Sequence, residues 1–275
     1  MRWGKQRRRA RVARRPFPEP WRDILRRNVP AYRELPPEDR LELERHVQVF
    51  LFEKRFEGAG GLSITDEIRV TIAAQACLLL LHRETDYYRR LSSIIVYPQA
   101  YLARRRSRHA SWVWSEHTET RLGESSTWGA VVLAWDAVRA AADDAADCHN
   151  VALHEFAHQL DAEDGHMEGS PVLPRAMYTT WARVLGEEFQ RLRRDSSAGR
   201  ETLLRGYGAK SPAEFFAVAS ECFFARGKAM QARHPALYAE LEQYYRQDPA
   251  AWGSSDTACE GCRGEGAPSE ERTNR

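Results

Sequence analysis

The segment from Asn150 to Asp161 constrains the fold of this chain more than any other, because it has the pattern of one helix with two different faces. Four apolar residues recur at the spacing of a single buried stripe, namely Leu153, Phe156, Ala157 and Leu160. His154 and His158 lie four positions apart, so their side chains share another face of the same helix. The pattern predicts a helix that packs on one side and carries two imidazoles on another.

The paired imidazoles have the spacing of a metal site. Two histidines one helical turn apart can close on one zinc ion at about 2.0–2.1 Å. Glu155 follows the first histidine and points to the side of the pair, where it can reach a metal-bound water without displacing it. Gly165 stands where the helix is expected to end. We therefore expect one Zn2+ per chain, bound by His154 and His158, with Glu155 as the general base.

Three residues compete for the place of a third metal ligand. Asp164 lies ten positions after His154, an offset used by some zinc proteases, but the helix-breaking glycine that normally accompanies it is missing. His166 lies close by, beyond the expected end of the helix. Glu214 lies on a later helix and would make a site shared between two helices. The spacing of the residues leaves all three open.

The helix that carries Glu214 has a well-marked start. Ser211 is a capping residue and Pro212 suits the first helical position, while Gly227 marks the end. Ser-x-x-Glu is also a capping box, in which the glutamate side chain bonds back to the helix start. This pattern explains Glu214 without any metal, so it does not decide the third ligand.

The remaining patterns predict an α+β fold with a helical N-terminal part and a small mixed or antiparallel sheet. Helices are expected at 37–56 and 66–81, with Thr65 as the cap of the second. Strands are expected at 93–97, 111–115 and 130–135, from their β-branched and aromatic residues. The strand at 131–135 is either an edge that pairs with an extended peptide or a central core strand, and the pattern does not decide between them.

The charges divide the chain into a basic arm and a mildly acidic body. Residues 1–15 hold eight Lys and Arg and no acidic residue. We expect residues 1–18 to be a disordered, solvated arm, residues 19–252 a single domain and residues 253–275 a disordered tail. Since Trp3 is the only aromatic residue among the basic ones, a nucleic-acid partner is not expected.

No segment has the pattern of a membrane span. The longest apolar run, Val70–Leu81, is too short to cross a bilayer and fits a buried helix. The basic start leads into a proline-rich stretch at 16–20 instead of the apolar core of a signal peptide. We expect a cytoplasmic protein without a membrane partner, in which Cys77, Cys148 and Cys222 are reduced core thiols.

Five segments together resemble one known family. They are His154–Asp161, Tyr207–Phe224, Ile94–Pro98, Val131–Trp135 and Tyr244–Pro249. Their sequences are similar to those of the Mlc titration factor A family of zinc peptidases, and the resemblance extends from about Pro20 to Trp252. The seven-residue spacing from Tyr207 to Glu214 also resembles that of lethal-factor-type toxin metalloproteases.

The resemblance implies a zincin-like domain and a complete set of site residues. It implies that His154, His158 and Glu214 bind zinc, that Glu155 is the general base, and that Tyr207 steadies the transition state. The expected protein is a zinc metallopeptidase that hydrolyses peptide bonds through a zinc-bound water. Its expected substrate is a peptide or a protein, and an aminopeptidase-type activity is one form that this hydrolysis could take. The alternative is a protein that sequesters a transcription regulator and has little or no peptidase activity.

Overall fold

The computed structural model describes residues 2–99, 101–109, 113–121, 123–126, 129–143 and 148–252, with the strands at 101–109, 113–121 and 123–126 described by their backbone alone. The first part of the chain is helical, as expected. Its helices are α1 (Arg2–Ala13), α2 (Glu19–Asn28), α3 (Pro30–Glu34), α4 (Pro37–Glu53) and α5 (Asp66–Leu78). Thr65 caps α5, since its side-chain oxygen accepts a hydrogen bond from the amide of Ile68 at 3.3 Å.

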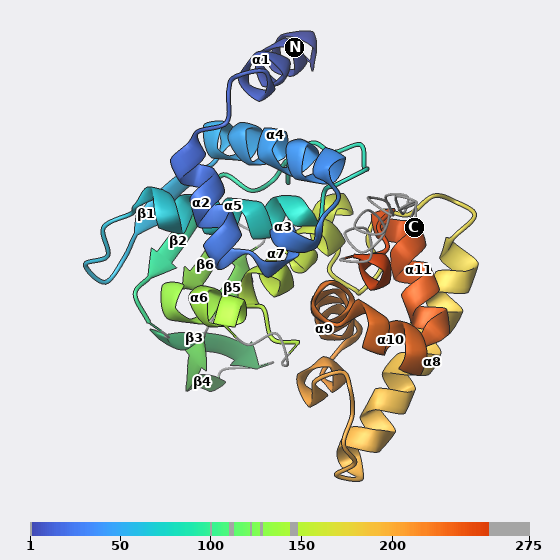
Figure 1. Cartoon of the computed structure of the whole chain (residues 1–275). Helices are drawn as coiled ribbons and strands as arrows, with labels where there is room; N and C mark the ends of the chain where they lie inside the picture. The colour runs from blue at the N-terminus through green and yellow to red at the C-terminus, as the bar shows by residue number, and fades with distance from the viewer. Residues whose placement is uncertain are drawn as a thin grey trace, which may run out of the picture.

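The basic N-terminal segment, for which we expected disorder, is the helix α1. Arg9 donates two hydrogen bonds to Glu53 at the end of α4, at 2.7 and 2.8 Å. Val12 is buried against the body of the protein. Because these contacts join residues more than 40 positions apart, the local composition could not reveal them. Figure 1 shows α1 at one end of the molecule, next to α4.

A four-stranded sheet runs in the order β1-β2-β6-β5. The strands are β1 (Arg55–Gly58), β2 (Ser93–Tyr97), β5 (Gly123–Ser126) and β6 (Ala130–Ala134). The first three in this order are parallel, and β5 is antiparallel to β6, so the sheet is mixed and the predicted α+β class is confirmed. A separate antiparallel pair is formed by β3 (Tyr101–His109) and β4 (Val113–Arg121).

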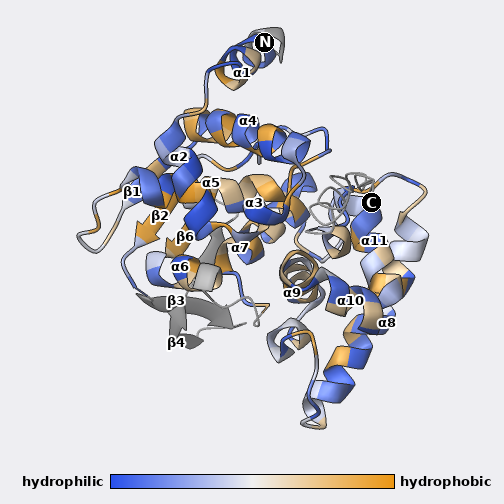
Figure 2. Cartoon of the chain, viewed as in Figure 1, coloured by the Kyte–Doolittle hydropathy of each residue, from blue (hydrophilic) through white to orange (hydrophobic). Residues whose placement is uncertain are grey.

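The strand β6 is a central strand of this sheet. Its register pairs Ile94 of β2 with Val131 on one side, while Ser125 of β5 pairs with the same residue on the other. Both backbone edges of β6 are therefore used, and the edge next to it is β5. The alternative of an edge strand at 131–135 is wrong. Figure 2 shows the apolar character of β2 and β6, which fits their buried position.

The helix α7 (Val151–Asp161) lies between the sheet and the C-terminal helices. It contacts α5, β5 and β6 on one side and α9 (Pro212–Ala225) on the other. Phe156 of α7 packs against Phe50 and Tyr88, with ring centroids 5.7 and 5.1 Å apart. All the residues of α7 are buried, so this helix is held firmly from both sides.

The other helices complete the C-terminal half and the link from the sheet to α7. They are α6 (Trp135–Asp143), η1 (Ala162–Asp164), α8 (Tyr178–Ser197), η2 (Gly206–Ala209), α10 (Gly227–Arg233), α11 (Pro235–Tyr245) and η3 (Pro249–Ala251). An aromatic cluster of Trp181, Phe216, Tyr244 and Tyr245 joins α8, α9 and α11. Among the described residues, no helix has both the length and the apolar character needed to span a bilayer.

Candidate metal centre

The candidate metal centre is built by side chains from α7 and α9. Asn150 caps α7 by accepting a hydrogen bond from the amide of Leu153 at 3.0 Å, so the helix begins one turn before His154. Ser211 caps α9 in the same way, through the amide of Glu214 at 3.2 Å. The caps fix where each helix starts, and therefore which residues of α7 and α9 face each other.

Three side chains converge where the two helices meet. Nε2 of His154 lies 3.2 Å from Nε2 of His158, and these atoms lie 3.0 and 3.3 Å from Oε2 of Glu214. A tetrahedral zinc with ligands at about 2.0–2.1 Å has ligand atoms about 3.3–3.4 Å apart. The separations of the three atoms are close to this value. Within the described part of the chain, one other group of three potential metal ligands has its ligand atoms within 4.8 Å of one another, namely Asp39, Glu42 and His82.

The chemistry of the three atoms also fits a cation. Nδ1 of His154 donates its proton to Oε1 of Glu221 at 2.7 Å, because a carboxylate can only accept. In the neutral imidazole, Nε2 then carries a lone pair that faces the Glu214 carboxylate, which is an acceptor as well. Two acceptors this close require positive charge between them. His154, His158 and Glu214 therefore form a donor set that suits a metal ion.

The pKa values of His154 and Glu214 also indicate that the site favours positive charge. Burial alone would lower the pKa of His154, but its hydrogen bonds to Glu214 and Glu221 raise that pKa to about 10. Burial would raise the pKa of Glu214, but the hydrogen bonds from His154 and His158 hold it well below its usual range. Without a metal, a proton on His154 supplies the charge that a bound cation would otherwise supply.

Glu155 and Tyr207 border this group. Glu155 is buried on α7 next to His154, and its charge acts on the imidazole of that residue. Tyr207 lies in η2, and its ring centroid is 5.8 Å from that of His154. The Tyr207 side chain is 43% exposed, so it is accessible from the solvent side of the site. Gly208 lets η2 pack closely, since a Cβ there would lie 3.2 Å from Leu192.

The other two candidates for a third ligand lie elsewhere. Asp164 and His166 are both exposed, and Asp164 accepts a hydrogen bond from the backbone amide of His166 at 2.9 Å. This contact forms a turn after η1. The structure brings Glu214, rather than Asp164 or His166, next to the two histidines.

Comparison with known proteins shows the family of the chain. The model of the family described as glucose-regulated metallo-peptidase M90 matches residues 3–246. The chain belongs to this family. The match includes all the segments on which the resemblance to the Mlc titration factor A family rests up to Arg246, and that resemblance is confirmed.

Individual relatives match most of the length of this chain in sequence. An uncharacterized protein of Synechocystis sp. is 41% identical over 239 residues, which are 86% of each chain. Mlc titration factor A of Edwardsiella ictaluri is 31% identical over 207 residues, covering 72% of this chain and 76% of that protein. Mlc titration factor A of Klebsiella pneumoniae is 28% identical over 233 residues, covering 84% and 86%.

The M90 chain also has supporting residues that sequence reasoning missed or left undecided. Glu221 of α9 accepts hydrogen bonds from both His154 and Arg205, at 2.7 and 2.8 Å. Arg205 was not predicted, because no local motif marks it. Asp161 is buried and accepts a hydrogen bond from the amide of Gly169 at 2.8 Å, which ties the following loop to α7.

The cysteines that we expected to be reduced core thiols are buried and form no disulfide with one another. Cys148 and Cys222 are nevertheless not isolated from each other. Their sulfur atoms lie 2.9 Å apart, next to the start of α7 and next to Glu221. Cys259 and Cys262 lie outside the described residues.

Proposed function

We propose that this protein is a zinc-dependent metallopeptidase in which His154, His158 and Glu214 bind one zinc ion. The single observation that carries the proposal is the convergence of these three side chains at separations of 3.0–3.3 Å. Membership of a family described as a metallo-peptidase supports it. When bound, a zinc ion supplies Lewis-acid chemistry that makes water a competent nucleophile near neutral pH.

Glu155 is the general base in this proposal. It follows His154 on a buried helix, so its carboxylate is held beside the metal ligands without being one of them. The carboxylate takes a proton from the attacking water and transfers it to the leaving amine. A site with a purely structural metal would gain nothing from such a base, and this favours catalysis.

Tyr207 is the residue that we propose to stabilise the transition state. Its ring lies edge-on to the ring of His154, and the phenol can donate a hydrogen bond to the oxygen that becomes negatively charged. Lys210 stands 3.9 Å from the centre of the Tyr207 ring and holds positive charge on this side of the site. The tyrosine is therefore available to substrate while remaining next to the metal ligands.

The substrate that we propose is an extended peptide, and the fold that we propose is zincin-like. Support comes from β5, the antiparallel edge strand of the sheet, which contacts the metal helix α7. An edge strand offers unpaired backbone groups to a peptide that lies alongside it. A peptide paired with β5 would lie along the strand that contacts α7, the helix that carries His154 and Glu155.

The test combines metal content with turnover in the same samples. Wild-type protein, Glu155→Gln and Glu214→Ala are purified, and their zinc content and hydrolysis of a panel of chromogenic amino-acid and peptide substrates are measured. We expect one zinc per chain in the wild type and in Glu155→Gln, a rate at least 100-fold lower in Glu155→Gln, and loss of both zinc and activity in Glu214→Ala. Wild-type turnover by Glu155→Gln would contradict the mechanism.

A second function is supported by the names of the relatives. Proteins named Mlc titration factor A match more than four fifths of this chain, so binding of a transcription regulator is a candidate here as well. The two functions predict different results for Glu155→Gln. A protein that only sequesters a regulator would bind it equally well with and without the general base, and would show no hydrolysis in either form.

A further inference from the structure

A cavity of about 510 Å3 lies apart from the metal centre. It is enclosed by α3, α5, the start of α7, the junction of α9 with α10, and Trp252 after η3. None of His154, His158 and Glu214 lines it. Its volume falls within the range of about 300–1,000 Å3 that is typical of small-molecule sites. The cavity has no part in the proposed peptidase reaction, and the comparisons with known proteins assign no function to it.

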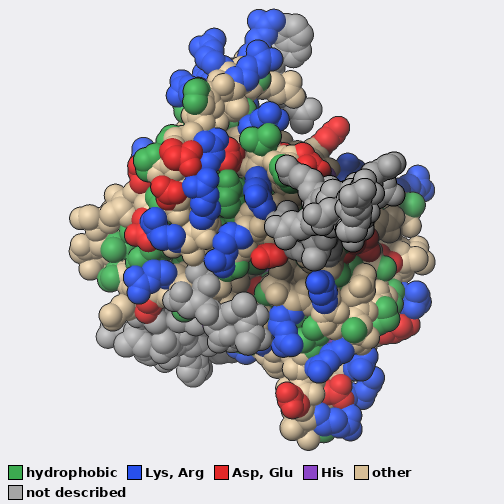
Figure 3. All heavy atoms as spheres, in the orientation of Figure 1, with side chains coloured by type: hydrophobic (Ala, Val, Ile, Leu, Met, Phe, Trp, Pro, Cys, Tyr) green, Lys and Arg blue, Asp and Glu red, His purple; other side chains and the backbone are tan. Residues whose placement is uncertain are grey.

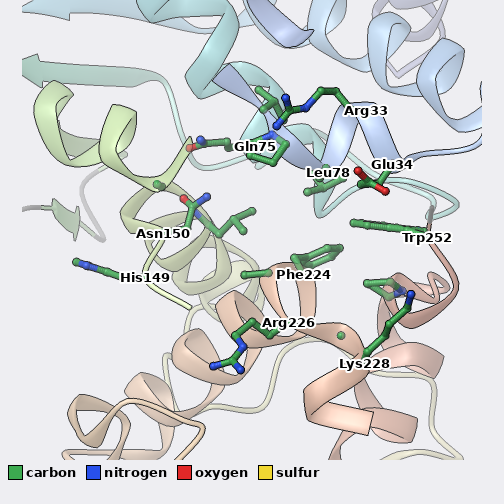
Figure 4. A pocket seen from close by; sticks show the side chains of 18 of the residues that line it. Arg33, Glu34, Gln75, Leu78, His149, Asn150, Phe224, Arg226, Lys228 and Trp252 are labelled. Atoms are coloured by element: carbon green, nitrogen blue, oxygen red, sulfur yellow. The ribbon is translucent and has the colours of Figure 1, made fainter. Parts of the chain in front are cut away.

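The walls of the cavity are mainly apolar. They include Val29, Leu78, Leu153 and Phe224, all of which are buried in the fold. Figure 4 shows Phe224, Leu78 and the flat indole of Trp252 around the same space. These five apolar side chains come from five separate parts of the chain. The cavity is therefore suited to an apolar body rather than to a highly hydrated one.

One buried polar side chain in the wall lacks a partner. Gln75 of α5 is only 2% exposed, and its carbonyl oxygen Oε1 makes no hydrogen bond within the described part of the chain. A buried acceptor left unpaired destabilises the folded state. Gln75 therefore adds a polar group to the wall of the cavity, although its Oε1 has almost no surface accessible from the cavity.

The charged side chains at the cavity determine which ligand charge it favours. Arg33 lies on one side of the opening, and Arg226 and Lys228 lie on the opposite side. None of these three cations forms an ion pair with a residue that the structure describes, and Glu34 is the one acidic residue among the described lining residues. Figure 3 shows Lys and Arg next to Asp and Glu over α2 and α3, where Arg22 and Arg26 are paired with acidic residues, so the excess of positive charge comes from the lining cations. The opening is therefore positively charged, which favours an anion.

We infer that this cavity binds a small amphipathic anion. The apolar body lies between Leu78, Phe224 and Trp252, and a carboxylate, sulfonate or phosphate group lies at the opening between the cations. This inference does not depend on the proposed peptidase activity, because the cavity and the metal centre share no residue.

A pair of fluorescent probes tests the two parts of the inference separately. 8-Anilinonaphthalene-1-sulfonate carries an aromatic body and an anionic group, whereas N-phenyl-1-naphthylamine has the same body without the charge. We expect saturable binding of both by the folded full-length protein, with tighter binding of the sulfonate. In the double variant Arg226→Gln/Lys228→Gln, the dissociation constant of the sulfonate should rise at least tenfold and that of the neutral probe should stay within twofold.

A second set of variants tests whether the cavity is the site. Ala31→Trp and Ala229→Trp each place a large side chain into the lining from a half-buried position. Both should lower the affinity for both probes at least tenfold while leaving the circular dichroism spectrum unchanged. The matched control is the exposed pair Arg193→Gln/Arg194→Gln on α8, which should bind both probes like the wild type.

Two carboxylates are then tested as competitors that displace the bound sulfonate probe from the cavity. Decanoate represents an aliphatic carboxylate and 1-naphthylacetate an aromatic one, and displacement by either supports the inference. Three results would overturn it: no saturable binding by the wild type, wild-type affinity in both folded tryptophan variants, or equal weakening of the charged and the neutral probe when Arg226 and Lys228 are neutralised.

Discussion

Nδ1 of His154 and Oε1 of Glu221 lie 2.7 Å apart, while the other nitrogen of the same imidazole faces Glu214. Oε2 of Glu221 accepts a further hydrogen bond from the backbone amide of Asn150 at 2.6 Å. One fully buried carboxylate thus sets the orientation and tautomer of a proposed metal ligand and also fixes the start of the helix that carries it.

Replacing Glu221 by Gln should weaken zinc binding by about 10–100-fold, since an amide cannot accept all the hydrogen bonds that the carboxylate accepts. The measurement is competition for zinc against a chromophoric chelator. Glu187→Gln on the exposed face of α8 is the matched control and should bind zinc like the wild type. Unchanged zinc affinity in Glu221→Gln would show that this contact does not position His154.

Replacing Arg205 by Leu should destabilise the protein by about 3 kcal/mol. Arg205 is the cation that faces the buried Glu221 carboxylate, at 2.8 and 3.1 Å, and removal of one partner leaves a buried charge uncompensated. Unfolding in urea measures the loss of stability. Arg205→Lys restores the charge without the planar guanidinium and should recover part of the lost stability. Equal stability of Arg205→Leu and the wild type would contradict the prediction.

Replacing Tyr207 by Phe should reduce kcat by about 100-fold while leaving zinc content and KM nearly unchanged. The ring contact with His154 is kept, and only the phenol hydroxyl, which we propose to act in the transition state, is lost. Steady-state kinetics on the best substrate of the peptide panel provides the measurement. A rise in KM without a change in kcat would instead assign the hydroxyl to substrate binding.

Lys54 predicts a pH dependence of stability. Its ammonium group is buried and donates to the backbone carbonyls of Tyr88 and Leu91, at 2.8 and 2.7 Å, and burial lowers its pKa to about 8. The folded protein therefore releases this proton near pH 8, whereas the unfolded chain releases it near pH 10.5. The contribution of Lys54 to the free energy of unfolding should rise with pH above 8, by up to about 1.4 kcal/mol per pH unit.

The comparison that isolates this effect is wild type against Lys54→Met, both unfolded in urea between pH 7.5 and 9.5. Buried tyrosines act in the opposite direction at higher pH, because burial raises the pKa of Tyr32 and Tyr244 to about 12. They are present in both proteins, so they cancel in the difference. Parallel stability profiles of the two proteins would exclude a titrating Lys54.

Replacing Arg9 by Met should cost about 2 kcal/mol of stability, because Arg9 forms the paired hydrogen bonds that join α1 to Glu53. Arg8→Met is the matched control, since Arg8 is exposed on the same helix. Thermal unfolding compares the two variants. If both lose the same stability, the α1 helix is held by its overall charge and not by this contact.

The sequence predicted best what depends on neighbouring residues. The start of α9 follows from Ser211 and Pro212, which act within one turn, and the structure confirms both. The α-helical part of α7 ends at Asp161, and a 3-10 turn continues it to the expected stop at Gly165. The pairing of His154 with His158 follows from helical geometry alone. The position of Glu214 beside them required the resemblance to a family, because a capping box accounts for a glutamate at this place equally well.

What the sequence did not reveal depends on distant contacts. The basic composition of 2–13 favours disorder, but Glu53 and Asp86 supply the opposite charge from elsewhere in the chain. Arg205 has no motif, and its importance appears only when Glu221 is seen to be fully buried. The edge strand β5 has the sequence Gly-Glu-Ser-Ser, without the alternating apolar residues that mark a strand.

The division of the proposed ligands between α7 and α9 has a consequence for the life of the protein in the cell. His158 and Glu214 are 56 positions apart, and the chain between them contains the whole of α8. A metal bound here acts as a removable cross-link that closes this loop, so its binding energy adds to the free energy of folding. Metal supply would then set how long each copy of the chain survives proteolysis, as well as how many copies are active.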